Sequence, residues 1–272
     1  MVTSPDPVAV ALLAVIGLVA LFPLLYGVRE LRLANHVLRS RPHSVLEATN
    51  GGPVELRGTA EPAGRTLRGP LSGARCLAYE YEVREKRQSK NGHSWKTIDS
   101  GEARVPFRLN DGSGSVLIEP PGADVRLHGG DRLDVDGGTA PPDSIQAFID
   151  ENEAVDCQNS AIDLRLFELR TGTDRRFVER RLEIGEEVHV LGTARHDTTV
   201  ATATGQVNAA VGVGEAALSS SPVTRLWYRL NGYPFVISDR SERGLGLRAG
   251  AAGLGVIAVT LVVVVGVAAT VL

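Results

Sequence analysis

The segment DRRFVERRLEIGEEVHVLGTA, which begins at Asp174, concentrates charged side chains that could bind a ligand or a partner. Arg176 and Arg180 are its best candidates, because arginine offers a planar fork of N–H donors to carboxylates and phosphates. If the segment is a strand, however, its alternating signs bring each arginine close to a glutamate, and such pairs stabilise sheets. The pattern favours a charge-laced, solvated sheet face, and a partner-binding patch is the alternative.

A second basic group, formed by Arg84, Lys86, Arg87 and Lys90, lies beside an Asn-Gly turn signal. We interpret it as the solvated tip of a β-hairpin. A contact with anionic lipid headgroups is the second interpretation, because such headgroups attract basic side chains held near a membrane. The net charge of −3 gives the chain no general attraction for phosphate, so we expect no nucleic-acid partner.

Motifs of the common enzyme classes are absent from the sequence. The phosphate-binding G-x-x-x-x-G-K-S/T, the nucleophile motif G-x-S-x-G and the zinc-binding H-E-x-x-H do not occur. We therefore expect no catalytic residue and no cofactor.

Metal-binding spacing is also missing. Cys76 and Cys157 stand far apart and the six histidines are scattered, whereas zinc sites use closely spaced ligand pairs. The segment at Asp134 faintly resembles a calcium loop, but Arg132 occupies its first ligand position. We expect no metal. The two cysteines would remain thiols in the cytoplasm and could form a disulfide outside it.

Two uncharged stretches, one near each end of the chain, are long enough to cross a membrane. Residues 8–28 and 250–272 contain no Asp, Glu, Lys or Arg, and a helix of about 20 apolar residues spans the hydrocarbon core. A cleaved signal peptide would begin with basic residues and have a shorter apolar core than the first stretch. For the second stretch the alternative is a buried core helix. We predict two transmembrane helices.

Arginines near the inner ends of the two stretches predict their orientation. They are Arg29, Arg32, Arg39 and Arg41 after the first stretch, and Arg240, Arg243 and Arg248 before the second. Lys and Arg are enriched on the cytoplasmic side of membrane spans. We expect a twice-spanning protein of the cell membrane, with its central domain in the cytoplasm and both termini outside.

Between the two stretches the pattern is mainly that of β-strands. LAYEYEVREK alternates apolar and polar residues up to the Asn-Gly turn, and PFRLNDGSGSVLIEPPGADV predicts another hairpin. Short strands at this spacing predict a small barrel- or sandwich-like β domain. One or two short helices complete it, the clearest at Pro142 to Asn152. The small, Gly-rich segment Thr198 to Pro222 predicts a weak strand followed by an exposed loop.

The predicted organisation has six parts. These are a tail at 1–7, a transmembrane helix at 8–28, a juxtamembrane helical segment at 29–44, the β domain at 45–241, a linker at 242–249 and a transmembrane helix at 250–272. Inside the β domain, VELRGTAEP from Val54 and VHVLGTARH from Val188 are similar in register. Two equivalent strands that lie side by side and close the domain would explain this similarity, and chance is the alternative.

Three ordered segments together resemble a known family. VELRGTAEPAGRTLRGPLSGARCLAYEYEVRE, WKTIDSGEARVPFRLNDGSGSVLIEPPGADV and RRFVERRLEIGEEVHVLGTA are similar to the GIDE or beside-a-membrane (BAM) domain of membrane-anchored E3 ubiquitin ligases and their prokaryotic relatives. The resemblance covers Val54 to Ser241 and extends to the span–domain–span order. It implies a membrane-side domain that recognises substrates or partners.

The zinc-binding RING of the eukaryotic members, which follows their second span, needs eight Cys and His ligands, and no such array occurs here. The resemblance thus implies the family fold without its transferase activity, and no catalytic residue carries over. We expect a membrane-proximal module that binds an unknown protein or lipid. The alternatives are a component of a ubiquitin-like ligase or proteolytic system, and a scaffold of a membrane complex.

Overall fold

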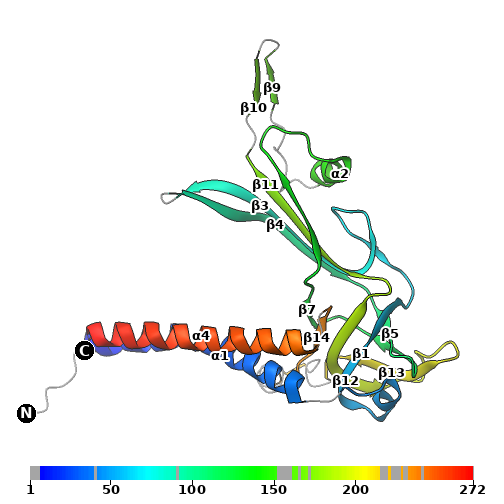
Figure 1. Cartoon of the computed structure of the whole chain (residues 1–272). Coiled ribbons are helices and arrows are strands. Elements are labelled where there is room, and N and C mark those ends of the chain that lie inside the picture. Colours follow the sequence, from blue (N-terminus) through cyan, green and yellow to red (C-terminus); the bar gives the residue numbers. More distant parts are fainter. Residues whose placement is uncertain are drawn as a thin grey trace, which may run out of the picture. The chain divides into compact units, whose positions relative to one another are not determined.

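The computed structural model describes residues 7–39, 42–89, 92–151, 161–164, 167–170, 173–214, 220–221, 228, 232–239 and 242–271. The chain divides into two compact units (Figure 1). The helical unit comprises Met1–Arg41, Ser220–Pro234 and Ser241–Leu272, and the β unit comprises Pro42–Ser219 and Phe235–Arg240. The predicted residues Lys90 and Cys157, and the turn residue Asn91, lie outside the described residues.

The helices are α1 (Pro7–Arg39), the 3-10 helix η1 (Val45–Asn50), α2 (Asp143–Glu151) and α4 (Glu242–Val271). The strands are β1 (Gly52–Pro62), β2 (Leu67–Arg68), β3 (Arg75–Ser89), β4 (Gly92–Arg104), β5 (Phe107–Asn110), β6 (Ser115–Ile118), β7 (Asp124–Arg126), β8 (Gly130–Val135), β9 (Ala161–Leu164), β10 (Phe167–Arg170), β11 (Arg175–Glu183), β12 (Glu187–His196), β13 (Gln206–Gly212) and β14 (Val236–Ser238).

In the helical unit, α1 and α4 lie side by side as an antiparallel pair (Figure 1). Glycines let the two backbones approach closely, as small residues do between membrane helices. A Cβ placed on Gly253 of α4 would lie 2.7 Å from the carbonyl oxygen of Gly27 in α1. Further along the pair, Gly250 faces the Cβ of Ala34. Close backbone packing therefore holds the helix pair together.

Both helices are long and apolar enough to cross a membrane, over Ala14–Val37 and Gly246–Val267. A core helix of a soluble protein would be mostly buried. In the most apolar parts of these two helices, only 17% and 11% of the residues are buried. Large apolar side chains face outward, among them Phe22 at 80% exposure and Val262 at 72%. The two predicted apolar helices are thus present, and their uncovered apolar surface is suited to lipid.

The β unit contains a closed five-stranded barrel. Its strands follow the order β1-β5-β6-β13-β12, and β1 pairs back to β12. Numbered along the chain, this order is first, second, third, fifth, fourth, with the third and fifth strands parallel, as in an OB-fold. The predicted pairing of the two similar segments is confirmed, because Val54 lies opposite Gly192 and Gly58 opposite Val188. β14 and β7 extend the sheet beyond β12.

Alternation along the strands separates the barrel core from its outer surface. Phe107 and Leu109 of β5 point inward with Val116 and Ile118 of β6, and all four are almost fully buried. Gly58 is required by a close approach, because a Cβ there would lie 2.4 Å from the backbone oxygen of Asn110. The predicted β5–β6 hairpin is confirmed.

A second sheet has the order β2-β3-β11-β8, with β4 paired to β3. The long β3–β4 hairpin was predicted and is confirmed. The predicted helix is also present as α2, which packs Ile145 and Ile149 against Val83 and Phe177 on one face of this sheet. The charged segment that begins at Asp174 supplies β11, whose turn at Gly185 leads into β12.

The strand predicted in the Gly-rich segment after Thr198 is present, while residues 215–219 and 222 of the loop predicted after it lie outside the described residues. This strand, β13, is a central strand of the barrel, and Ala209 and Ala210 are fully buried. The neighbouring strand β12 has a glycine where it packs against β13. A Cβ on Gly192 would lie 2.7 Å from the Cγ1 of Val211. The two strands therefore pack closely at Gly192.

Candidate functional site

The open face of the second sheet, which is the side opposite α2, gathers most of the predicted site residues. Alternation and register place on it Glu80, Glu82, Arg84, Lys86, Trp95, Thr97, Arg132, Asp134, Arg176, Val178 and Arg180. Four of the six predicted partner-binding residues thus share one surface. Arg87 falls on the other face by alternation, and Lys90 lies outside the described residues.

Arg176 is the most firmly held of these arginines. Its Nε donates a 2.8 Å hydrogen bond to Oδ1 of Asp134, and its guanidinium lies 4.1 Å from the ring centre of Trp95. Hydrogen bonds from Arg132 and Arg176 hold the pKa of the Asp134 carboxyl well below its usual value. Because a guanidinium over an aromatic face is attracted to it, Arg176 and Trp95 form an ordered amphipathic spot on the open face.

Each of the other described basic candidates has an acidic partner. The pairs are Arg84–Glu82 at 2.5 Å, Lys86–Asp174 at 2.8 Å, Arg87–Glu85 at 3.0 Å and Arg180–Glu80 at 3.8 Å. These ion pairs agree with the solvated sheet face of alternating charges that the sequence favours.

On the other face of the second sheet, a buried carboxylate of β11 connects this strand to residues 71 and 72. Glu179 is 1% exposed and accepts hydrogen bonds from the Leu71 backbone N–H at 2.7 Å and the Ser72 hydroxyl at 2.5 Å. Arg181 Nη1 donates a third at 2.6 Å. Burial opposes the charge on Arg181, but its bonds to Glu179, Asp131 and Glu183 outweigh this effect and raise its pKa. The sequence contains no signal that distinguishes Glu179 from its exposed neighbours.

A second buried pair lies on the outer side of the barrel. His189 Nε2 and Glu55 Oε1 are 2.8 Å apart, and both side chains are almost fully buried. In the β1–β12 pairing, His189 lies opposite Arg57, and Glu55 is the next residue of β1 on the same face. Sequence reasoning treated His189 as one of the scattered histidines and missed this contact.

Asp111 fixes the β5–β6 turn to η1. Its Oδ2 accepts a 2.8 Å hydrogen bond from the Val45 backbone N–H, and its Oδ1 accepts from Ser113 and Gly114. Burial acts to raise the Asp111 pKa, but these hydrogen bonds outweigh it and lower the pKa. This carboxylate is a structural group.

Cys76 is a free thiol buried in the β unit. Burial, and next the negative charge of Glu179, raise its pKa to about 11. A protonated and covered thiol is a poor nucleophile and a poor metal ligand. Within the described residues, no group of three or more His, Cys, Asp and Glu side chains could hold a metal ion.

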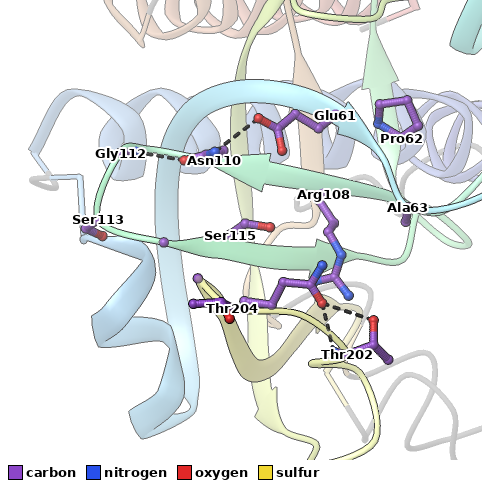
Figure 2. Close-up of a pocket in the computed structure, with 13 residues that line it drawn as sticks. Glu61, Pro62, Ala63, Arg108, Asn110, Gly112, Ser113, Ser115, Thr202 and Thr204 are labelled. Atoms are coloured by element: carbon purple, nitrogen blue, oxygen red, sulfur yellow. Dashed lines mark hydrogen bonds between the residues drawn. The ribbon is translucent and has the colours of Figure 1, made fainter.

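A polar cavity of about 420 Å³ lies beside the barrel strands (Figure 2). Its walls come from β1, the β5–β6 hairpin, the loop of residues 197–205 and the start of β13. They include Glu61, Arg108, Asn110, Ser115, Thr202 and Gln206. The Asn110 side chain donates to Glu61 Oε1 at 3.0 Å and accepts from the Gly112 backbone N–H at 2.9 Å (Figure 2). Gln206 Oε1 accepts from the backbone N–H of Thr202 at 2.8 Å, which fixes the loop. The walls of the cavity are thus ordered.

Arg108 is the unusual residue of this cavity. It alternates with the core residues Phe107 and Leu109 and so points out of the barrel, yet it is only 8% exposed. The loop of residues 197–205 covers it, and its Nη2 donates to the carbonyl oxygen of Val200. Sequence reasoning did not select Arg108, because the loop that buries it lies about 90 residues further along the chain.

Part of the β unit matches a known family. Residues 78–206 match the GIDE family, which is described as E3 ubiquitin ligase. No curated protein and no solved structure matches the chain. The matched segment covers most of the β3–β4 hairpin, the β5–β6 hairpin, β11 and β12. It therefore includes the second and third of the segments that resembled this family, and only residues 78–85 of the first. The chain therefore contains a GIDE-family domain over residues 78–206.

Proposed function

We propose that this GIDE protein is anchored in the cell membrane by α1 and α4, and that its β unit binds a protein partner in the cytoplasm without catalysing a reaction itself. The observation that carries the proposal is the pair of largely uncovered apolar helices that flank the β unit in the sequence. The arginines near the inner ends of both helices support the cytoplasmic placement.

The open face supports a protein partner rather than a lipid surface. Anionic headgroups attract surplus positive charge, whereas the described basic residues of the open face are paired with carboxylates. Arginine and tryptophan are enriched where protein interfaces bind most strongly, and Arg176 and Trp95 are already ordered against each other. We therefore place the partner contact around Arg176 and Trp95.

The membrane anchor is tested by extraction and by topology. We expect the protein to remain in the pellet after alkaline carbonate treatment of membranes. For topology, Cys76 is unsuitable because it is buried. A Ser94→Cys substitution places a thiol at an exposed position of β4 in a Cys76→Ser, Cys157→Ser background. Labelling by an impermeant maleimide only after cell lysis supports the cytoplasmic placement, and labelling of intact cells contradicts it.

The partner contact is tested by affinity purification from detergent-solubilised membranes. Arg176→Ala and Arg180→Ala together should release a partner that the wild type retains. Arg57→Ala is the matched control, because Arg57 is a half-exposed arginine of the barrel that also pairs with a glutamate. If the double variant retains every partner in wild-type amounts, the open face does not carry the contact.

The family description favours a second candidate function, a component of a ubiquitin-like ligase system. In that case the partner on the open face would be a conjugating enzyme or a ubiquitin-like protein. Mass spectrometry of the retained partners distinguishes the candidates. Transfer of a ubiquitin-like protein by the purified chain alone would contradict the proposal of a non-catalytic module.

A further inference from the structure

We propose that the cavity beside β5 and β6 binds a small oxyanion, a carboxylate or a phosphate monoanion, through Arg108 and Ser115. This site is separate from the open face of the second sheet and does not depend on the function proposed for that face.

The first argument is the state of Arg108. Its side chain extends from β5 along the cavity toward the loop of residues 197–205 (Figure 2). Nη2 is satisfied by the Val200 carbonyl, but Nη1 is buried and has no hydrogen-bond partner among the described residues. A buried guanidinium N–H group without an acceptor destabilises the folded protein, and a bound anion would supply the missing acceptor.

The second argument is Ser115, the first residue of β6. It too points out of the barrel, is 7% exposed and lines the same cavity. Its Oγ is buried without a partner, whereas its backbone N–H is satisfied by the Gly205 carbonyl at 2.9 Å. A hydroxyl and a guanidinium on neighbouring strands provide two donors of the kind that bind carboxylate and phosphate oxygens.

The charge of the cavity limits the charge of the ligand. Burial lowers the pKa of Arg108, and the negative charge of Glu61, its cross-strand neighbour, partly opposes this effect. One arginine balanced by one nearby glutamate suits a singly charged group better than a polyphosphate. A volume of about 420 Å³ lies in the lower part of the range for small-molecule sites and agrees with a compact ligand.

Equilibrium dialysis tests the site on the full chain in detergent. The probes are radiolabelled acetate and radiolabelled phosphate, each measured against a constant excess of sodium chloride. We expect saturable binding of one equivalent per chain for at least one probe, and the two arms distinguish a carboxylate from a phosphate site. Two variants assign the binding. Arg108→Gln should abolish it, and Ser115→Ala should weaken it about tenfold, as loss of one hydrogen bond to a charged group does.

Ser115→Ala tests the site independently if the Arg108→Gln variant fails to fold. Because the hydroxyl has no partner, its replacement by a methyl group should leave the thermal midpoint of the ligand-free protein equal or higher. Arg57→Gln is the control and should bind as the wild type does. The proposal is overturned if neither probe binds, or if binding is unchanged in both Arg108→Gln and Ser115→Ala, which would indicate an adventitious ion only.

Discussion

Replacing Glu179 with Gln removes one negative charge from the most crowded polar contact of the second sheet while it keeps the shape of the side chain. In the wild type, the two carboxylate oxygens accept hydrogen bonds from the Leu71 N–H, the Ser72 hydroxyl and Arg181. The glutamine amide has only one acceptor oxygen. Its NH₂ group must therefore face a donor that the carboxylate had satisfied.

The cost can be estimated from these contacts. A hydrogen bond to a charged group contributes about 1.5–3 kcal/mol, and Glu179→Gln weakens at least two of them. Removal of one partner of a buried ion pair costs about 3–5 kcal/mol, which agrees with that sum. We therefore expect the free energy of unfolding of the β unit to fall by about 3–5 kcal/mol, which multiplies the unfolded fraction by more than a hundred.

Urea unfolding of the full chain in detergent measures this change. Tryptophan fluorescence is a suitable signal, because Trp95 lies in the same sheet in contact with Arg176. Glu183→Gln is the matched control. Glu183 also binds Arg181, at 3.1 Å, but its side chain is 59% exposed, so its loss should cost less than about 1 kcal/mol. Equal costs for the two variants, or a cost below about 1 kcal/mol for Glu179→Gln, would refute the reasoning.

Three further predictions concern other parts of the molecule. Gly253→Val should separate α4 from α1 and lower the thermal midpoint in detergent, whereas Gly255→Val, where a Cβ meets nothing within 4 Å, should not; equal effects would contradict the close packing. Because the folded pKa of Asp111 is lowered, its stabilisation is present above the unfolded value of about 4 and is lost as the pH falls through the folded value. Unfolding free energies measured between pH 2 and 7 should thus fall less on acidification in Asp111→Asn. In a Cys157→Ser variant, Cys76, with its pKa of about 11, should react with a maleimide at pH 8 only after addition of urea, and rapid labelling of the native protein would show that the thiol is accessible.

The sequence predicted the elements that depend on local patterns. Alternation with an Asn-Gly or Asp-Gly turn identified the β3–β4 and β5–β6 hairpins, and the apolar stripe identified α2. The pattern did not decide between a barrel and a sandwich, because barrel closure depends on the pairing of distant strands. It predicted a strand in the segment of β13 but not the burial of that strand in the barrel, because Ala and Gly residues are also typical of a loop.

The candidate sites were predicted in part for the same reason. Arg176 and Arg180 were selected by type and alternation, and both lie on the open face. Their partners Asp134 and Trp95 come from other strands, so spacing along one segment did not reveal them. Arg108 was missed because its burial is imposed by a loop distant in the sequence.

The β1–β12 seam determines which fragment of this chain can fold alone and when folding can finish during synthesis. The matched segment, residues 78–206, lacks β1 and all but the first residue of β13. If excised at these boundaries, it would leave one unpaired edge on β5, one on β6 and both edges of β12, and exposed edges promote aggregation. On the ribosome, β1 is made early but must wait for β12 and β13 before its circle of hydrogen bonds is complete. Closure of the barrel is therefore a late step in the synthesis of this chain.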